Sequence, residues 1–178
     1  MLSLLVSCSE KEDTTPSNAD KDRLETLIDA SIEKIVNFRD SYGTYILYNF
    51  DKNLDFAYQF EQASSWTGAT LKMIGHDDAE VAVGMLYDKL FGCYSDEFKK
   101  KCFPRKLLLV DDIATGSELG LSQPESGHHT AVANINSVTF AKMGENNVAQ
   151  ALEDGEGMEA NAAEMHRALL ADYLVKAR

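Results

Sequence analysis

The chain has 178 residues, of which 44% are hydrophobic and 26% are charged, and its formal net charge is −12. This length suits one domain with a tail, and the composition is ordinary for a globular protein that buries a core. The excess of carboxylates repels nucleic acid phosphates and anionic membrane surfaces, so we expect no nucleic acid partner. No apolar stretch approaches the roughly 20 residues that a membrane-spanning helix needs.

The chain begins with a short apolar stretch that ends in Leu5-Val6-Ser7-Cys8. These four residues resemble the lipobox of bacterial lipoproteins. In that family the cysteine is lipidated and the peptide is cut just before it. Each buried acyl methylene then adds about 0.8 kcal/mol to membrane binding. The resemblance implies a lipid anchor at Cys8, with the membrane as a partner. Residues 1–7 lack the basic start and length of a complete secretory signal, so we interpret them as a truncated signal peptide. The alternative is a chance apolar start of a cytosolic protein.

Residues 8–21 are polar, contain Pro16 and show no apolar periodicity, so we expect a disordered tether. Lys11-Glu12-Asp13 also resembles the Lys-acid-acid tag that follows the lipidated cysteine in some surface-exported lipoproteins of Gram-negative bacteria. This resemblance implies an outer-membrane lipoprotein that is exposed at the cell surface. An ordinary solvated charge cluster is the alternative interpretation.

From residue 22 to 178 the patterns predict an α+β domain, in which a small mixed or antiparallel sheet packs with helices. Apolar residues at helical spacing predict a first helix with one stripe from Leu24 to Val36. Aromatic and β-branched residues predict a strand at 44–50 and a hairpin partner at 56–60, joined by turn residues at 51–53. Residues 64–75 are expected to be irregular.

The second half of the domain begins with a helix capped by Asp77 or Asp78, with Val81, Met85, Leu86 and Leu90 on its buried face. The remaining expected elements are a short helix at 96–101 that Ser95 starts, a buried strand at 106–110, a loop at 111–130, a strand at 131–141, a loose polar segment at 144–157, and a final helix at 158–178 with Met165, Leu169, Leu170, Tyr173 and Leu174 inward.

Few residues suggest chemistry. Cys93 and Cys102 are either a disulfide, which an oxidising envelope would allow, or two buried free thiols. A zinc peptidase helix uses HExxH, because positions i and i+4 share a face. From His166 the sequence reads His-Arg-Ala-Leu-Leu, so Arg167 and Leu170 replace the base and the second ligand.

The other candidate site residues have plain structural alternatives. His128 and His129 lie in the expected loop, His76 stands before a helix, and Asp111-Asp112 follows a strand as a carboxylate pair. Five aromatic residues can form either a surface for a glycan or peptide, or part of the core: Tyr42, Tyr45, Tyr48, Tyr58 and Trp66.

The order of elements, with the segments 42–50 and 103–110 and a late helix that contains His166, resembles zinc-binding metallopeptidase lipoproteins of gut-type Gram-negative bacteria. The resemblance covers about residues 22 to 178 and implies a zincin-like N-terminal half. In that family the late helix carries a His-His-Glu-x-x-x-His type zinc motif. Here His166 is the one metal-ligand remnant, because Arg167, Ala168 and Ala171 stand at the other positions. We expect a domain that is incomplete at its C-terminus.

Three hypotheses follow from these observations. The first is a lipid-anchored pseudoenzyme with a binding or accessory role, no catalytic residues and no cofactor. The second is an active zinc metallopeptidase whose ligands come from elsewhere, such as His128, His129 and an acidic residue, or from a missing segment. The third is a glycan-binding surface lipoprotein that uses exposed aromatic residues such as Trp66.

Overall fold

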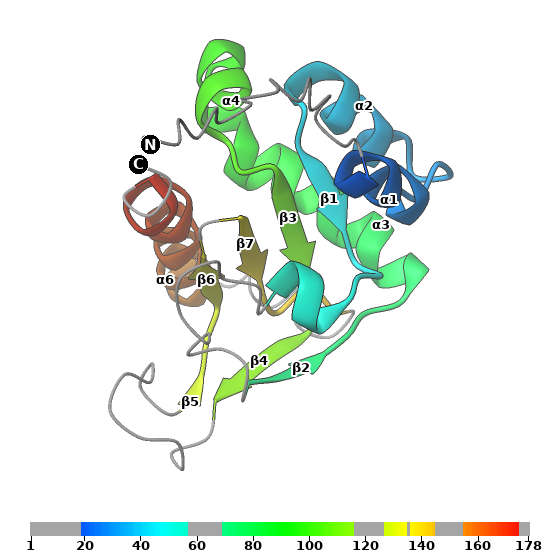
Figure 1. The fold of residues 1–178 in the computed structure, drawn as a ribbon. Coiled ribbons are helices and arrows are strands. Elements are labelled where there is room, and N and C mark those ends of the chain that lie inside the picture. Colours follow the sequence, from blue (N-terminus) through cyan, green and yellow to red (C-terminus); the bar gives the residue numbers. More distant parts are fainter. Residues whose placement is uncertain (1–18, 57–68, 116–126, 135, 145–154, 175–178) are drawn as a thin grey trace, which may run out of the picture.

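The computed structural model describes residues 19–56, 69–115, 127–134, 136–144 and 155–174. A four-stranded sheet in the order β1-β3-β7-β6 lies at its centre, with β1, β3 and β7 parallel and β6 antiparallel to β7. A second, antiparallel sheet has the order β2-β4-β5 and lies beyond the carboxyl end of β3 (Figure 1). The strands are Tyr45–Leu47 (β1), Thr70–Lys72 (β2), Lys106–Leu109 (β3), Asp112–Thr115 (β4), Gly127–His128 (β5), Ala131–Ala133 (β6) and Ser137–Phe140 (β7).

Helices cover both faces of the four-stranded sheet (Figure 1). They include short π and 3₁₀ segments, which are labelled η. The helices are α1 (Ala19–Leu27), α2 (Glu33–Tyr42), η1 (Lys52–Phe56), α3 (His76–Met85), η2 (Leu86–Leu90), η3 (Phe91–Cys93), α4 (Asp96–Cys102), α6 (Gly155–Arg167) and η4 (Ala168–Tyr173). This arrangement of helices with small mixed and antiparallel sheets confirms the predicted α+β class. The zincin-like character of the N-terminal half stays a prediction.

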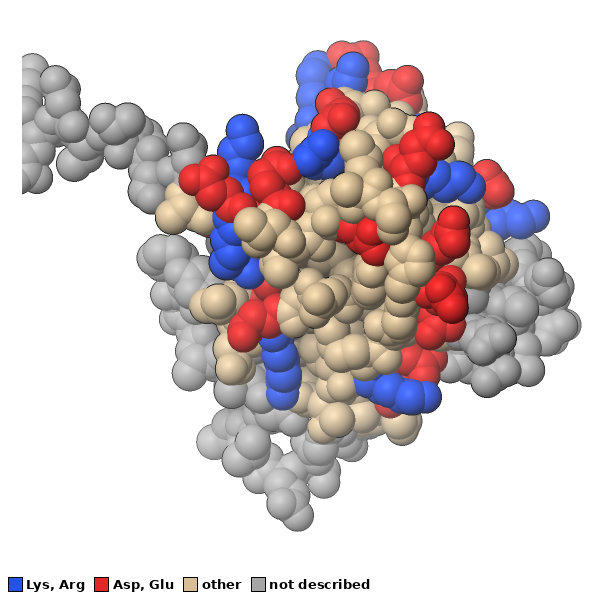
Figure 2. Space-filling model, turned by 90° about the vertical axis from the view of Figure 1, so that its right-hand side faces the viewer, with Lys and Arg blue, Asp and Glu red and all other residues tan. Residues whose placement is uncertain are grey.

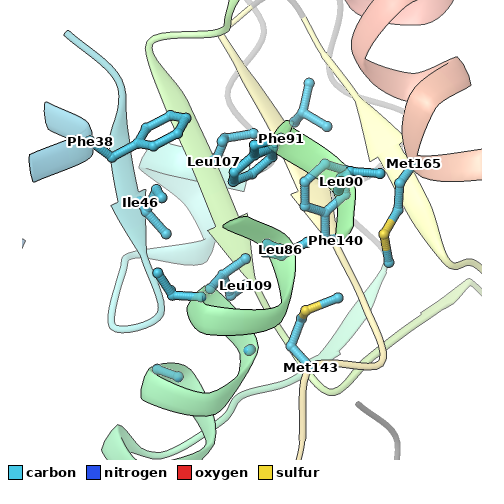
Figure 3. Close-up of a cluster of buried hydrophobic side chains, with 14 of the residues drawn as sticks. Phe38, Ile46, Leu86, Leu90, Phe91, Leu107, Leu109, Phe140, Met143 and Met165 are labelled. Atoms are coloured by element: carbon cyan, nitrogen blue, oxygen red, sulfur yellow. The ribbon is translucent and has the colours of Figure 1, made fainter. Parts of the chain in front are cut away.

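Strand β3 separates two hydrophobic cores. Leu107 and Leu109 point into the larger core, whereas Leu108 and the following Val110 point into the smaller one, since successive side chains of a strand alternate between faces. Figure 3 shows the larger core, where Leu86 and Leu90 of η2 lie against the sheet. Helix α1 and η1 cover the smaller core. The apolar run at 106–110 is therefore a strand that is buried on both faces, as predicted.

In the N-terminal third, one prediction was wrong and another is tested only at its turn. The expected long helix is interrupted, because the Asp29 side chain accepts hydrogen bonds from the backbone N–H and hydroxyl of Ser31 and so forms a turn between α1 and α2. The expected hairpin is absent from the described residues: β1 pairs with β3 in parallel. The Asp51 carboxylate accepts from the N–H groups of Asn53 and Leu54, which favours the helical turn η1 over a hairpin turn. Residues 57–60 lie outside the described residues.

The elements in the middle of the chain differ from expectation in detail. Strand β2 lies in the segment expected to be irregular, and β4 and β5 lie in the expected loop at 111–130. The expected strand at 131–141 is two strands, because the Asn134 side chain accepts from the N–H groups of Asn136 and Ser137 and so turns the chain. Helix α4 begins after Ser95, whose hydroxyl caps it by accepting from the N–H of Phe98, as predicted.

Burial on two helices also differs from the predicted faces. Val81 is 55% exposed, and the small residues Ala79 and Ala82 take the buried positions of α3, since close packing against the core favours them there. Helix α3 starts at His76 and its cap position is Gly75, two or three residues before the expected cap at Asp77 or Asp78, and Asp78 accepts from the N–H of Gly75 at 3.4 Å. In the C-terminal helix, Met165 and Leu169 are buried as predicted, whereas Leu170 is 39% exposed, because the helix widens to the π form from Ala168.

A buried ion network joins α1, η1 and β3. The fully buried carboxylate of Asp55 accepts from Arg23 at 2.5 and 3.1 Å and from the ammonium of Lys106 at 3.0 Å. Burial alone would raise the pKa of Asp55, but the hydrogen bonds and charges of Arg23 and Lys106 together hold it below its ordinary value. The network therefore depends on an ionised carboxylate.

We predict that Asp55→Asn destabilises the protein by about 3–5 kcal/mol, because it leaves two cations without their buried partner. Denaturant unfolding at neutral pH measures this. The matched control is Asp20→Asn, which removes an exposed ion pair with the same arginine and should cost within about 0.5 kcal/mol.

The sign of the pH dependence follows from the lowered pKa of Asp55. Its contribution is present above the ordinary aspartate pKa of about 3.9 and is lost as the pH falls through the folded-state value. The difference between wild type and Asp55→Asn should therefore shrink in acid. A difference that stays constant down to the acid transition would contradict this role for the carboxylate.

Candidate functional site

The first polar cluster lies where β3 ends, at the predicted carboxylate pair. Asp111 is 8% exposed, and its backbone N–H donates to the carbonyl of Lys72 at 2.7 Å. Its carboxylate forms an ion pair with the Lys72 ammonium, and the hydrogen bond and charge of Asp111 raise the pKa of that lysine. The carboxylate pair is thus divided: Asp111 faces β2 and Asp112 begins β4.

The segment after β7 closes over Asp111. Lys142 has a positive φ of 62° and donates its N–H to the carbonyl of Asp111 at 2.9 Å, and the N–H of Met143 donates to Val110. A Cβ on Gly144 would lie 2.4 Å from Oδ1 of Asp111, so the carboxylate rests directly on this glycine. The left-handed backbone conformation of Lys142 and the absence of a side chain at Gly144 allow the backbone to approach the buried Asp111 closely.

The Lys142 side chain ties this segment to the C-terminal helix. Its ammonium donates to Oδ1 of Asn161 at 2.9 Å, and the hydroxyl of Thr130 donates to the same oxygen at 3.3 Å. Sequence reasoning missed Lys72, Lys142 and Gly144, because an exposed lysine or a loop glycine carries no signal of the acid that it will contact.

The histidine pair of the second hypothesis is split between environments. His128 is exposed on β5, and its Nδ1 lies 2.8 and 2.9 Å from the two carboxylate oxygens of Asp112. His129 is half-buried, and its backbone N–H donates to the carbonyl of Ile113. The structure brings one histidine and one carboxylate together. Within the described ranges, no group of three or more His, Cys, Asp or Glu residues is placed to hold a metal.

His166 lies on the last turn of α6, half-buried beside an aromatic cluster. Its Nδ1 and the hydroxyl of Tyr94 are 2.5 Å apart, and the two rings meet edge to face. Burial lowers the pKa of His166 and raises that of Tyr94 to about 12, so both groups are uncharged at neutral pH. Arg167 points to solvent and pairs with Asp172 at 3.6 Å.

His76 belongs to a third cluster, at the start of α3. Its Nδ1 lies 2.8 Å from Oδ2 of Asp29, and the hydroxyl of Tyr48 donates to the same oxygen at 2.5 Å. The sequence interpretation of His76 as a helix-start residue is confirmed, since α3 begins there. Its partner Asp29 was not singled out, although the sequence Asp-Ala-Ser is a pattern typical of such turns.

The candidate aromatic surface is only partly described, because Tyr58 and Trp66 lie outside the described residues. Each of the other three tyrosines donates its hydroxyl to a carboxylate: Tyr42 to Asp96 at 2.8 Å, Tyr45 to Glu25 at 2.7 Å and Tyr48 to Asp29 at 2.5 Å. The hydroxyl groups of these three tyrosines therefore form hydrogen bonds between different parts of the fold. Tyr45 is also buried, at 6% exposure.

Cys93 and Cys102 are both free thiols in the structure. Cys93 is exposed at the end of η3 and donates to the carbonyl of Leu90 at 3.0 Å. Cys102 is half-buried at the end of α4 and borders a shallow hollow of about 280 Å³ with Ser95, Glu97, Phe98 and Lys101. The disulfide stays a prediction, and Cys8 lies outside the described residues.

Comparisons with protein-family models, curated proteins and solved structures each found no match. The resemblance to metallopeptidase lipoproteins therefore stays a prediction from the sequence. Among the described helices, none combines the length and apolar character that crossing a membrane requires.

We predict that Gly144→Ala destabilises the protein by about 1–3 kcal/mol, because the new Cβ overlaps the Asp111 carboxylate. Thermal or denaturant unfolding measures this. The control is Gly92→Ala, where the nearest atom to a Cβ is the carbonyl oxygen of Tyr87 at 3.6 Å, an ordinary contact.

A double-mutant cycle isolates the cause. The three atoms nearest to the Gly144 Cβ position all belong to Asp111, so Asp111→Ala should relieve most of the cost of Gly144→Ala. Strictly additive effects would show that the two residues do not meet in this way.

Proposed function

We propose that this chain is a bacterial envelope lipoprotein, anchored through Cys8 and exposed at the outer membrane surface, whose α+β domain has a binding or accessory role and no peptidase activity. The lipobox-like sequence that ends at Cys8 and the polar residues after it support the anchor. Among the described residues the first element is α1, which begins at Ala19, so the last three residues of the expected tether are helical.

The residues beside His166 carry the non-catalytic part of the proposal. Tyr94 engages Nδ1 of His166 at 2.5 Å, which leaves Nε2 as its one nitrogen for a metal. The family motif would place ligand, base and ligand at Arg167, Ala168 and Ala171. The first is exposed and paired with Asp172, and the second is fully buried in the core. An exposed arginine that pairs with a carboxylate and a buried alanine cannot hold zinc or polarise a bound water.

The second candidate is a zinc peptidase with ligands elsewhere, and the contact between His128 and Asp112 favours it. A carboxylate on Nδ1 fixes the imidazole and leaves Nε2 for a metal, as second-shell carboxylates do in zinc sites. The further ligands would come from residues outside those described. A glycan-binding role for Trp66 is a third possibility from the sequence.

We predict that the protein, expressed from its own locus with the upstream coding DNA, incorporates an alkyne-tagged fatty acid and that Cys8→Ala abolishes the label. The variant should also move from the membrane fraction to the soluble fraction, since it lacks acyl chains. Cys93→Ala removes an exposed thiol and is the matched control, which should stay labelled. Label on Cys8→Ala, or an unlabelled wild type, would refute the anchor.

We predict that the purified protein, incubated with zinc and dialysed, retains well under one zinc per chain and shows no chelator-sensitive peptide cleavage. Atomic emission and a fluorogenic peptide mixture measure these. About one zinc per chain would overturn the proposal. In that case His128→Ala and His166→Ala identify the site: loss of zinc in the former supports the second candidate, and loss in the latter supports a retained family site.

A further inference from the structure

The connection between α1 and α2, residues 28–32, is held by one carboxylate. Asp29 accepts four hydrogen bonds: from the backbone N–H and the hydroxyl of Ser31 at 2.9 and 2.5 Å, from the Tyr48 hydroxyl at 2.5 Å and from His76 Nδ1 at 2.8 Å. Tyr48 follows β1 and His76 begins α3, so the carboxylate joins three elements that are far apart in the sequence.

This connection covers apolar side chains. Ile28 packs against both hydrophobic cores, and Ile32 is 3% exposed within the larger one. Residues 28–32 therefore cover the edges of both cores, and a connection that lifted would expose these side chains to water. The three groups Asp29, Tyr48 and His76 are called the latch below.

We propose that the latch is pH-sensitive: it holds the α1–α2 connection closed while His76 carries its proton and loosens the connection when that proton is lost.

The geometry gives solvent access to the titrating group. The His76 side chain is 45% exposed, whereas that of Asp29 is 20% exposed, so the proton exchanges freely while the carboxylate is sheltered. Figure 2 shows the side of the molecule on which the α1–α2 connection and the start of α3 lie. Lysine, arginine and acidic side chains mix around the rim of this face, and its middle is mostly uncharged.

Three acidic side chains raise the pKa of His76. The hydrogen bond that His76 makes to Asp29 raises it most strongly, burial opposes this as the next-largest effect, and the charges of Asp29, Asp77 and Glu80 raise it further. Tyr48 stays protonated, because its hydrogen bond to Asp29, followed by burial, raises its pKa to about 12.

The pH window follows from two shifts of opposite sign. Hydrogen bonds from Ser31, Tyr48 and His76 hold the pKa of Asp29 well below its usual range, so its contribution is present above about pH 4. The pKa of His76 is raised, so its contribution is full below about pH 6.5 and is lost as the pH rises through the folded-state value. Neutral His76 keeps a hydrogen bond, but a charge-assisted bond is about twice as strong as a neutral one.

Hydrogen exchange of the Ser31 amide, which bonds directly to Asp29, tests the proposal. With intrinsic exchange rates corrected for pH, we expect its protection to fall about two- to five-fold between about pH 5.5 and about pH 9, the range that an exposed ion pair gives. Amides of β3 should show no such change, because the core strands do not depend on the latch.

Two matched variants separate the latch from general effects of pH. His76→Asn keeps a side-chain donor but cannot titrate, so its Ser31 protection should be independent of pH. His128→Asn removes the other exposed histidine–aspartate pair and should respond as the wild type does. Constant Ser31 protection in the wild type, or an equal fall in His76→Asn, would overturn the proposal.

Discussion

The fold depends on keeping an ionised carboxylate in a place that water does not reach. Asp55 lies on the helical turn after β1, fully buried, and its charge is balanced by Arg23 from α1 and Lys106 from β3. A buried ion is costly unless its partners are close and its lone pairs are filled, and both conditions hold here. The network therefore ties α1 and η1, which cover the smaller core, to β3.

Two further carboxylates with close donors lie at the carboxyl edge of the parallel strands. Asp111 after β3 is held by Lys72 and by the backbone that bends over it at Gly144, and Asp29 is held by hydroxyl, amide and imidazole donors near the end of β1. In each case one acid joins segments that the sequence separates widely. Apolar burial supplies most of the driving force for folding, but it is non-directional, so these polar contacts set which segments meet.

The proposed lack of catalysis rests on a contrast between two histidines. His166 is drawn into the aromatic cluster by Tyr94, and burial favours its neutral form. His128 is exposed and oriented by Asp112, as a metal ligand would be, yet within the described chain further ligands do not gather around it. The arrangement favours a domain whose polar groups organise the fold, and the proposed lipid anchor at Cys8 would set where the domain acts.

The sequence by itself determined the class and several local features, because these depend on near neighbours in the chain. The apolar run at 106–110 specified a strand buried on both faces, and Ser95 specified the start of α4. Tertiary structure decided the partnerships across the chain. Strand β1 pairs with β3 in parallel, and the carboxylates of Asp55, Asp29 and Asp111 meet cations and donors up to 51 positions away. The sequence alone does not show whether an acidic side chain is exposed to water or buried with a partner. Only the packing of remote segments decides whether water or a lysine satisfies it.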